Sequence, residues 1–112
     1  MMNKIVFYGS GNISQAIASG LISSGYDKNL IEFIDRNKIN SSRTKKLGIR
    51  KTKLKTIDPK SIIFLGVKPK DAISAYSEIS SVIKKPMIVS LVAGIKSNKY
   101  LNKYKNIQLI RA

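Results

Sequence analysis

The stretch Lys4-Ile-Val-Phe-Tyr-Gly-Ser-Gly-Asn-Ile-Ser14 decides the fold of this chain. Residues 4–8 form a short apolar run rich in β-branched and aromatic side chains, a composition typical of a buried strand. Gly9-Ser10-Gly11 follows at once and predicts a tight turn out of that strand. The run is far too brief for a secretory signal or a membrane span, which makes a cytoplasmic protein the simplest inference.

A helix is expected to follow the turn, over residues 12–24, with Gly25 at its C-terminal end. Apolar side chains recur every four residues along this segment and are predicted to pack on a sheet. They are Ile13, Ile17 and Leu21. Ala16 and Gly20 are small, and they are predicted to let the helix approach the sheet closely.

The remaining chain alternates short apolar runs with amphipathic segments. Strands are expected over residues 30–34, within 49–55, and over 61–67, 87–92 and 107–110. Helices are expected from residue 38 up to Gly48, for one turn after Asp58-Pro59, from Asp71 to Ile83, and near Ser97. The third of these helices is predicted to face inward with Ile73, Tyr76, Ile79 and Ile83, and the fourth with Leu101 and Tyr104. Strands that alternate with helices at this spacing predict one parallel sheet with helices on both faces, and no linker divides residues 1–112.

The pattern Gly9-x-Gly11-x-x-Ser14 matches the dinucleotide fingerprint, with serine in the third small-residue position. Its context fits, because the pattern lies between a strand and a helix whose free N–H groups would face a pyrophosphate. The alternative is a tight turn that binds nothing. The pattern predicts an α/β, Rossmann-type doubly wound parallel sheet that binds a dinucleotide at Gly9, at Gly11 and at the start of the helix near Asn12.

Asp35-Arg36-Asn37 closes the second predicted strand, where such folds bind the adenosine ribose. A carboxylate at this place binds the 2′-hydroxyl of NAD, whereas a nearby arginine accepts the 2′-phosphate of NADP. If Asp35 points into the pocket, NAD is favoured; if it turns away, Arg36 and Asn37 favour NADP. The positive charge of the chain favours NADPH, and capping of the next helix is the alternative role for Asp35.

Two later strand ends are expected at the same edge of the sheet, since ligands of doubly wound sheets bind beyond the carboxyl ends of the strands. They contribute the candidate cofactor residues Gly66, Val67, Lys68, Pro69, Val92, Ala93 and Gly94. Small residues there would let a nicotinamide ring lie against the backbone. Lys68 is the strongly polar side chain of this set, and a solvated surface lysine is the alternative to a phosphate ligand.

The composition limits the chemistry that the chain could perform on its own. It has no cysteine and no histidine, so disulfides, thiolate metal sites and the commonest general base are excluded. The 6 acidic residues are scattered singly, without the paired carboxylates that hydrolases use. No catalytic and no metal-binding residue is therefore predicted, and the chemistry must come from a cofactor.

The net charge of +15, from 21 basic and 6 acidic residues, would attract polyanions such as nucleic acid. The basic residues are mostly lysines spread along the whole chain, without an aromatic cluster or a recognisable nucleic-acid-binding module. Specific nucleic-acid binding is therefore not expected, and a basic nucleic-acid-binding protein is kept as an alternative.

Five motifs stand in order along the chain: Phe7-Tyr-Gly-Ser-Gly-Asn-Ile13, Gly20-Leu-Ile-x-x-Gly25, Phe64-Leu-Gly-Val-Lys-Pro69, Val89-Ser-Leu-Val-Ala-Gly-Ile95 and Ile110-Arg-Ala112. Together they resemble pyrroline-5-carboxylate reductase, and this resemblance implies reduction of 1-pyrroline-5-carboxylate to proline by hydride transfer from a nicotinamide. The resemblance implies an adenosine ribose near 35–37 and a nicotinamide beside 66–69 and 92–94. It also implies a cofactor loop at residues 8–13, whose contacts are Tyr8, Gly9, Ser10, Gly11, Asn12 and Ile13. The departures are Ser10, Ser14 and Gly66, which stand where the family often has alanine.

The resemblance also implies an all-helical C-terminal domain, which in the family makes the dimer and much of the substrate pocket. This chain stops after Arg111-Ala112. A single cofactor-binding domain lacking that helical domain is expected to bind NADPH or NADH without substantial turnover, because the groups that position the substrate are missing. It is also expected to self-associate through apolar surface. A stand-alone dinucleotide-binding or regulatory module is the alternative.

Overall fold

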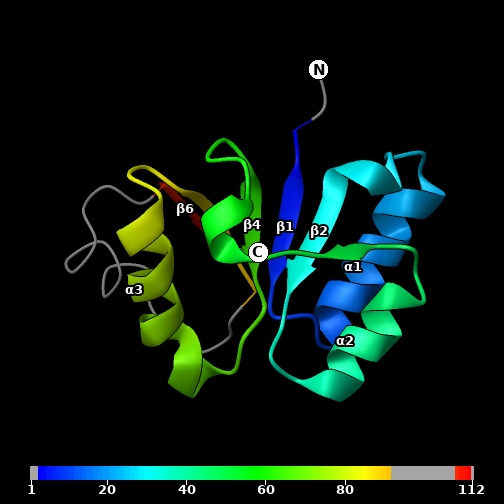
Figure 1. Cartoon of the computed structure of the whole chain (residues 1–112), viewed down its shortest axis with the longest axis horizontal. Coiled ribbons are helices and arrows are strands. Elements are labelled where there is room, and N and C mark those ends of the chain that lie inside the picture. The colour runs from blue at the N-terminus through cyan, green and yellow to red at the C-terminus, as the bar shows by residue number, and fades with distance from the viewer. Residues whose placement is uncertain (1–2, 92–107, 112) are drawn as a thin grey trace.

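The computed structural model describes residues 3–91 and 108–111, the last four as backbone. In these residues six parallel strands form one sheet, in the order β3-β2-β1-β4-β5-β6 (Figure 1). The strands are β1 (Ile5–Tyr8), β2 (Ile31–Ile34), β3 (Arg50–Lys51), β4 (Ile62–Leu65), β5 (Met87–Ser90) and β6 (Gln108–Arg111). The winding direction reverses between β1 and β4, which confirms the doubly wound, Rossmann-type sheet expected from the sequence.

Helices cover both faces of this sheet, with α1 and α2 on one side and α3 on the other (Figure 1). Their bounds are α1 (Asn12–Ser23), α2 (Lys38–Lys45) and α3 (Ala72–Val82), and 3₁₀ turns occur at Lys28–Leu30, Leu54–Thr56 and Pro69–Asp71. In the part of the chain that the structure describes, no helix is long and apolar enough to cross a membrane.

Two hydrophobic cores, one on each face, hold the sheet in place. Alternate side chains of β1 enter different cores, since successive side chains of a strand point to opposite faces. The core under α1 contains Ile5, Phe7, Ala18, Ile31, Phe33 and Ile49. The core under α3 contains Val6, Ile57, Ile63, Leu65, Ala72, Ala75, Tyr76, Ile79, Ile83 and Ile88. Burial of each large aliphatic or aromatic side chain contributes about 1.5–3 kcal/mol, so both cores stabilise the sheet against unfolding.

The inward face of α1 differs in part from the one predicted. Ile17 and Leu21 pack against the core as expected. Ser14 and Ala18 are the buried residues of this helix, whereas Ile13 is 61% exposed. Ala16 and Gly20 are exposed as well, so they do not provide the close approach expected of them. The reason is that the third small residue of the glycine pattern, Ser14, must pack against β1. The most buried positions of the helix are therefore 14 and 18, one residue after the predicted positions 13 and 17.

Two other predicted elements had different outcomes. Arg50–Lys51 forms the short edge strand expected within residues 49–55. The helical turn expected after Asp58-Pro59 is wrong: Asp58 closes a tight turn instead, accepting the Lys60 N–H at 2.8 Å and the Ser61 N–H at 2.9 Å. β4 begins at Ile62, so the chain has too little length there for a helix. The helix predicted near Ser97 lies outside the described residues.

Candidate functional site

The carboxyl ends of four neighbouring strands are tied together by backbone hydrogen bonds. The Gly9 N–H donates to the Ile34 carbonyl at 2.8 Å, which joins the turn after β1 to the end of β2. The Gly66 N–H donates to the Tyr8 carbonyl at 2.9 Å, which joins the turn after β4 to β1. The Leu91 N–H donates to the carbonyl of Leu65 at 2.8 Å. The end of β2 and the turns after β1, β4 and β5 therefore form one continuous edge, which holds the candidate residues Tyr8, Gly9 and Gly66.

Gly9 occupies the tightest place in this edge. Its φ is +90°, in the left-handed region that side chains disfavour. A Cβ there would also lie 2.8 Å from both the carbonyl carbon and the carbonyl oxygen of Gly66, and 3.1 Å from Cγ1 of Val67. The first glycine of the fingerprint is thus required both by backbone conformation and by the neighbouring turn.

Ser14 and Gly66 fit together beneath this turn. The Ser14 hydroxyl donates to the Gly9 carbonyl at 2.7 Å, and Ser14 is buried. A Cβ at Gly66 would overlap the Ser14 hydroxyl oxygen and would lie 3.2 Å from the Gly9 carbonyl oxygen. The two departures from alanine noted in the sequence are therefore complementary, because the serine hydroxyl fills the space that glycine leaves.

Gly11, by contrast, faces open space. It is the N-cap of α1 and provides no side-chain cap, and a Cβ built on it would meet nothing within 4 Å. The first N–H groups of a helix have no partner within the helix, so those of α1 remain available to an anion here. A cleft of about 360 Å³, the glycine-loop cleft, lies at this point. It is lined by Gly11, Asn12, Ile13, Ser14, Gly66, Val67 and Leu91.

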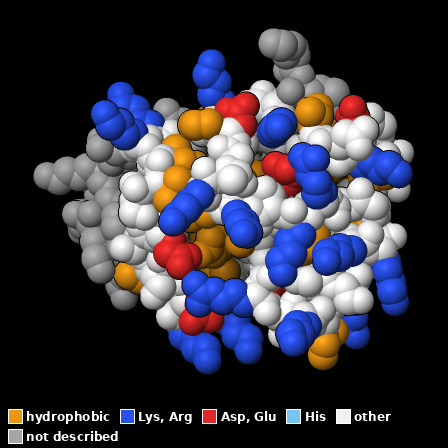
Figure 2. All heavy atoms as spheres, in the orientation of Figure 1, with side chains coloured by type: hydrophobic (Ala, Val, Ile, Leu, Met, Phe, Trp, Pro, Cys, Tyr) orange, Lys and Arg blue, Asp and Glu red, His pale blue; other side chains and the backbone are white. Residues whose placement is uncertain are grey.

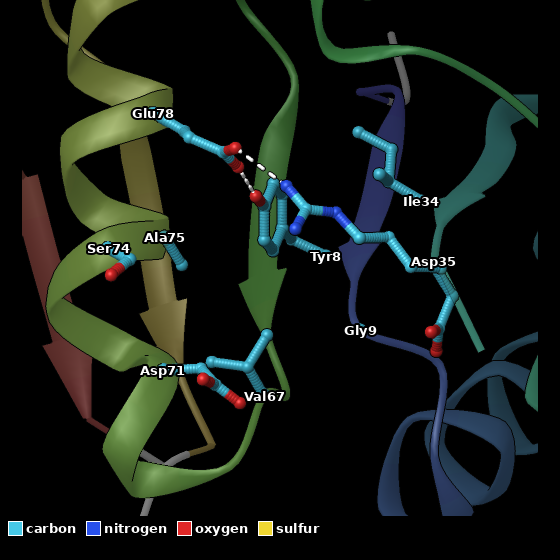
Figure 3. Close-up of a pocket in the computed structure, with 10 residues that line it drawn as sticks. Tyr8, Gly9, Ile34, Asp35, Val67, Asp71, Ser74, Ala75 and Glu78 are labelled. Carbon is cyan, nitrogen blue, oxygen red and sulfur yellow. Dashed lines mark hydrogen bonds and ion pairs between the residues drawn. The ribbon is translucent and has the colours of Figure 1, made fainter.

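The Asp35 carboxylate is turned toward the glycine loop. Its Oδ2 accepts the Ser10 N–H at 2.7 Å, the Ser10 hydroxyl at 2.9 Å and the Asn40 side-chain amide at 3.3 Å. Its Oδ1 accepts the Asn37 N–H at 2.8 Å. Figure 3 shows this carboxylate directed away from Tyr8 and Glu78. Asp35 therefore ties the loop after β1 to the loop after β2.

This environment lowers the pKa of Asp35 below its ordinary value of 3.8. Burial acts in the opposite direction and raises the pKa, but the hydrogen bonds from the Ser10 and Asn37 backbone, the Ser10 hydroxyl and the Asn40 amide outweigh it. All four bonds favour the charged form, so Asp35 is an anion at neutral pH. Helix capping, the alternative role for Asp35, is performed by Asn37 instead. Asn37 caps α2 by accepting the Asn40 N–H at 3.0 Å.

Arg36 leaves the same loop in another direction and reaches α3. Its Nη2 lies 3.0 Å from Oε1 of Glu78, and the Tyr8 hydroxyl donates to Oε2 of the same carboxylate. Figure 3 shows Glu78 extending from α3 toward Tyr8, with both interactions dashed. The two carboxylate oxygens of Glu78 are thus bound by different partners, one from the end of β1 and one from the loop after β2.

A second cleft of about 360 Å³, the α3 cleft, opens beneath this ion pair. From the strand ends and their turns it is lined by Tyr8, Gly9, Ile34, Asp35, Arg36 and Val67. From α3 and the turn before it come Asp71, Ser74, Ala75 and Glu78. Its volume is at the lower end of the range for small-molecule sites. Figure 2 shows basic side chains scattered over the visible face rather than gathered into one patch.

Other candidate residues have less direct places in this site. Val67 lines both clefts. Lys68 and Pro69 are exposed and line neither cleft. Residues 92–94, the candidates that follow β5, lie outside the described residues. Within residues 3–91, no group of three or more acidic side chains is placed to hold a metal ion.

The stripe of α3 that faces the cleft was missed in the sequence. Asp71, Ser74, Ala75 and Glu78 follow the i, i+3, i+4, i+7 spacing of one helix face. The apolar face predicted for this helix is confirmed at Tyr76 and Ile79, which are buried. The polar residues Asp71, Ser74 and Glu78, which recur at helical spacing beside that apolar face, are the sequence signal that could have indicated this stripe. Leu91 was missed because its role depends on where β5 ends relative to β4.

The comparisons with known proteins agree with this geometry. A family model described as "NADP oxidoreductase coenzyme F420-dependent" matches residues 4–94. The chain belongs to this family. The match covers every described element from β1 to β5, including both clefts.

The curated relatives are pyrroline-5-carboxylate reductases. The chain is 40% identical over 103 residues to one from Staphylococcus aureus (strain COL), covering 82% of this chain and 36% of that reductase. It is 30% identical over 99 residues to pyrroline-5-carboxylate reductase 2 of Bacillus subtilis (strain 168), covering 84% and 36%. A solved pyrroline-5-carboxylate reductase from Coxiella burnetii superposes with a TM-score of 0.87 at 25% identity, covering 97% and 43%.

These matches confirm the resemblance read from the five motifs. They also agree with the prediction of a cofactor-binding part, since the chain spans little more than a third of the length of the curated relatives it matches.

Proposed function

We propose that this chain binds a nicotinamide dinucleotide across the two clefts, as the cofactor-binding part of a pyrroline-5-carboxylate reductase. The observation that carries the proposal is the open space at Gly11, beside the uncapped N-terminus of α1. A pyrophosphate needs close access to backbone N–H groups, and a side chain at this position would block it.

The proposed pose follows from the order of the strands. The pyrophosphate lies at Gly11 to Ile13, and the adenosine extends into the α3 cleft, where Asp35-Arg36-Asn37 leaves β2. The nicotinamide extends the other way, past Gly66 and Leu91. Asp35 is engaged by the glycine loop, which leaves Arg36 as the basic side chain nearest the ribose side and favours NADPH.

The reaction proposed for the bound cofactor is hydride transfer to 1-pyrroline-5-carboxylate, giving proline. It is supported by the names of the curated relatives and by the fold of a solved Plasmodium falciparum pyrroline carboxylate reductase, which has NADP bound and a TM-score of 0.73 at 20% identity. The nicotinamide would supply the hydride. The residues of this chain would position the cofactor, with no catalytic side chain of their own.

Two further parts of the proposal concern partners and location. β6 is at the edge of the sheet and pairs with β5 alone among the described strands, and an open edge favours self-association. Sedimentation at rising protein concentration checks this. We also propose a cytoplasmic location, in keeping with the lack of cysteine, and cell fractionation checks it.

The test of the proposed function is calorimetric titration with NADPH and with NADH, on the wild type and on two glycine variants. Gly11→Val fills the space proposed for the pyrophosphate. Gly20→Val is the matched control, since a Cβ at Gly20 also meets nothing within 4 Å but lies on the outer face of α1. We expect Gly11→Val to abolish measurable binding while both variants keep the wild-type circular dichroism spectrum.

Two results would contradict the proposal. Failure of the wild type to bind either dinucleotide would reduce the glycine pattern to a tight turn. Equal binding by Gly11→Val and the wild type would place any dinucleotide elsewhere. Tight binding to an unrelated oligonucleotide, weakening steeply with salt and unaffected by Gly11→Val, would favour the nucleic-acid alternative.

A further inference from the structure

Acidic residues are unexpectedly concentrated at the α3 cleft. The chain has 6 acidic residues against 21 basic ones, yet Asp35, Asp71 and Glu78 all line this one cleft. Arg36 is the one basic side chain lining the cleft in the described part of the chain. A ligand that carries extra negative charge on its adenosine ribose would therefore depend on Arg36 and would meet these carboxylates.

The three acids are not equivalent. Asp35 is bound by the glycine loop and by Asn37 and Asn40, so its charge is engaged away from the opening. Asp71 makes no ion pair with Arg36 among the described residues. Glu78 does make that ion pair, at 3.0 Å, and its second oxygen accepts the Tyr8 hydroxyl. Glu78 is thus the acid that competes directly for the arginine.

We propose that Glu78, held in place by Tyr8, is a specificity-determining residue. By occupying the Arg36 guanidinium, it reduces the preference of the site for a 2′-phosphorylated dinucleotide over one with a free 2′-hydroxyl. This inference rests on the proposed function. A 2′-phosphate that reaches Arg36 must displace the Glu78 carboxylate or share the guanidinium with it, at the cost of like-charge repulsion. A dinucleotide with a free 2′-hydroxyl meets no such competition and leaves the ion pair intact.

Tyr8 gives this competition its geometry. A glutamate on a half-exposed helix face can normally swing into solvent when a stronger anion arrives, and the Glu78 side chain is 44% exposed. The phenol of Tyr8, at the end of β1, fixes one carboxylate oxygen over the cleft so that the other remains aimed at Arg36. Removal of the Tyr8 hydroxyl should therefore reproduce part of the effect of removing the Glu78 charge.

The expected effect is modest, because Arg36 is largely exposed and solvent screens the pair. Surface ion pairs of this kind shift equilibria about twofold to fivefold. Glu78→Gln should tighten NADPH binding by about that factor at low salt, while its effect on NADH stays below about 1.5-fold. The glutamine can still accept the Tyr8 hydroxyl, so the change removes charge without removing the contact.

The experiment measures dissociation constants for NADPH and NADH on the wild type, Glu78→Gln, Tyr8→Phe and the control Asp71→Asn. Asp71→Asn removes one negative charge from the same cleft without freeing Arg36, so it separates direct competition from a general charge effect. We expect the ratio of the two dissociation constants to shift toward NADPH in Glu78→Gln, less in Tyr8→Phe, and least in Asp71→Asn. A double variant, Arg36→Gln with Glu78→Gln, should lose the shift.

The outcomes distinguish this inference from the function beneath it. If the wild type binds neither dinucleotide, the proposed function fails and the inference fails with it. If the wild type binds both dinucleotides and Glu78→Gln changes the two dissociation constants by the same factor, the proposed function stands and the inference is overturned. The same conclusion follows if Asp71→Asn changes the ratio of the two constants as much as Glu78→Gln does. Weaker NADPH binding in Glu78→Gln would also overturn it, because Glu78 would then be holding Arg36 ready for the phosphate.

Discussion

Replacing Gly66 by alanine tests whether the turn after β4 is packed against Ser14 as the structure describes. The new methyl group would overlap the Ser14 hydroxyl oxygen, and Ser14 is buried with its hydroxyl committed to the Gly9 carbonyl at 2.7 Å. Overpacking of this kind costs about 1–3 kcal/mol. Gly66→Ala should therefore lower the free energy of unfolding by about that amount, although φ at Gly66 is not positive.

Ser14→Ala should be destabilising for a different reason. It removes the hydrogen bond to the Gly9 carbonyl, at a cost of about 0.5–1.5 kcal/mol. In the double variant the methyl group at 66 enters the space that the serine hydroxyl has left. The overlap with the Ser14 hydroxyl disappears, and the remaining 3.2 Å approach to the Gly9 carbonyl oxygen needs only a small shift. The Gly→Ala change also returns about 0.4–1 kcal/mol by restricting the unfolded chain. The double variant should therefore be close to the wild type in stability.

The assay is urea unfolding followed by far-ultraviolet circular dichroism on the four proteins of this double-mutant cycle. We expect a coupling energy of at least about 1.5 kcal/mol, with the double variant more stable than Gly66→Ala alone. Gly20→Ala is the control, since its Cβ meets nothing within 4 Å. Effects at Ser14 and Gly66 that add within about 0.5 kcal/mol would refute the reasoning, because independent sites behave that way.

Two further predictions concern the same edge of the sheet. Gly9→Ala should lower the free energy of unfolding by about 2–5 kcal/mol, from the positive φ and from the overlap with Gly66, as urea titration would measure; a loss below about 1 kcal/mol would contradict this. Because the pKa of folded Asp35 is lowered, its stabilising contribution is complete above about pH 4 and is lost as the pH falls through the folded value. Asp35→Asn should therefore be less stable than the wild type at pH 7, with a smaller gap at pH 2–3, and a gap that does not change with pH would contradict the assignment.

The order of elements and the general place of the site were predictable from the sequence. Apolar runs alternating with helical segments predict a parallel sheet, and Gly9-Ser10-Gly11 between a strand and a helix predicts the turn that carries the site. These signals are local, since each depends on residues within one element or one turn. The strands and the inward face of α3 were predicted for this reason. The helical turn predicted after Asp58-Pro59 was wrong, because a local capping signal does not show how few residues separate it from the next strand.

Partners distant in the sequence were decided by the tertiary structure alone. The sequence left two directions open for Asp35, and the structure turns it to Ser10, 25 residues away. Arg36 pairs with Glu78, 42 residues away, because the sheet order places the end of β2 across a cleft from α3. In the sequence, Ser14 and Gly66 are two separate small departures from the alanine that the family often has, and only the folded structure shows that they pack against each other. The sequence by itself determined which elements form and where a ligand would approach, whereas side-chain pairing depends on distances that exist only once the strands lie side by side.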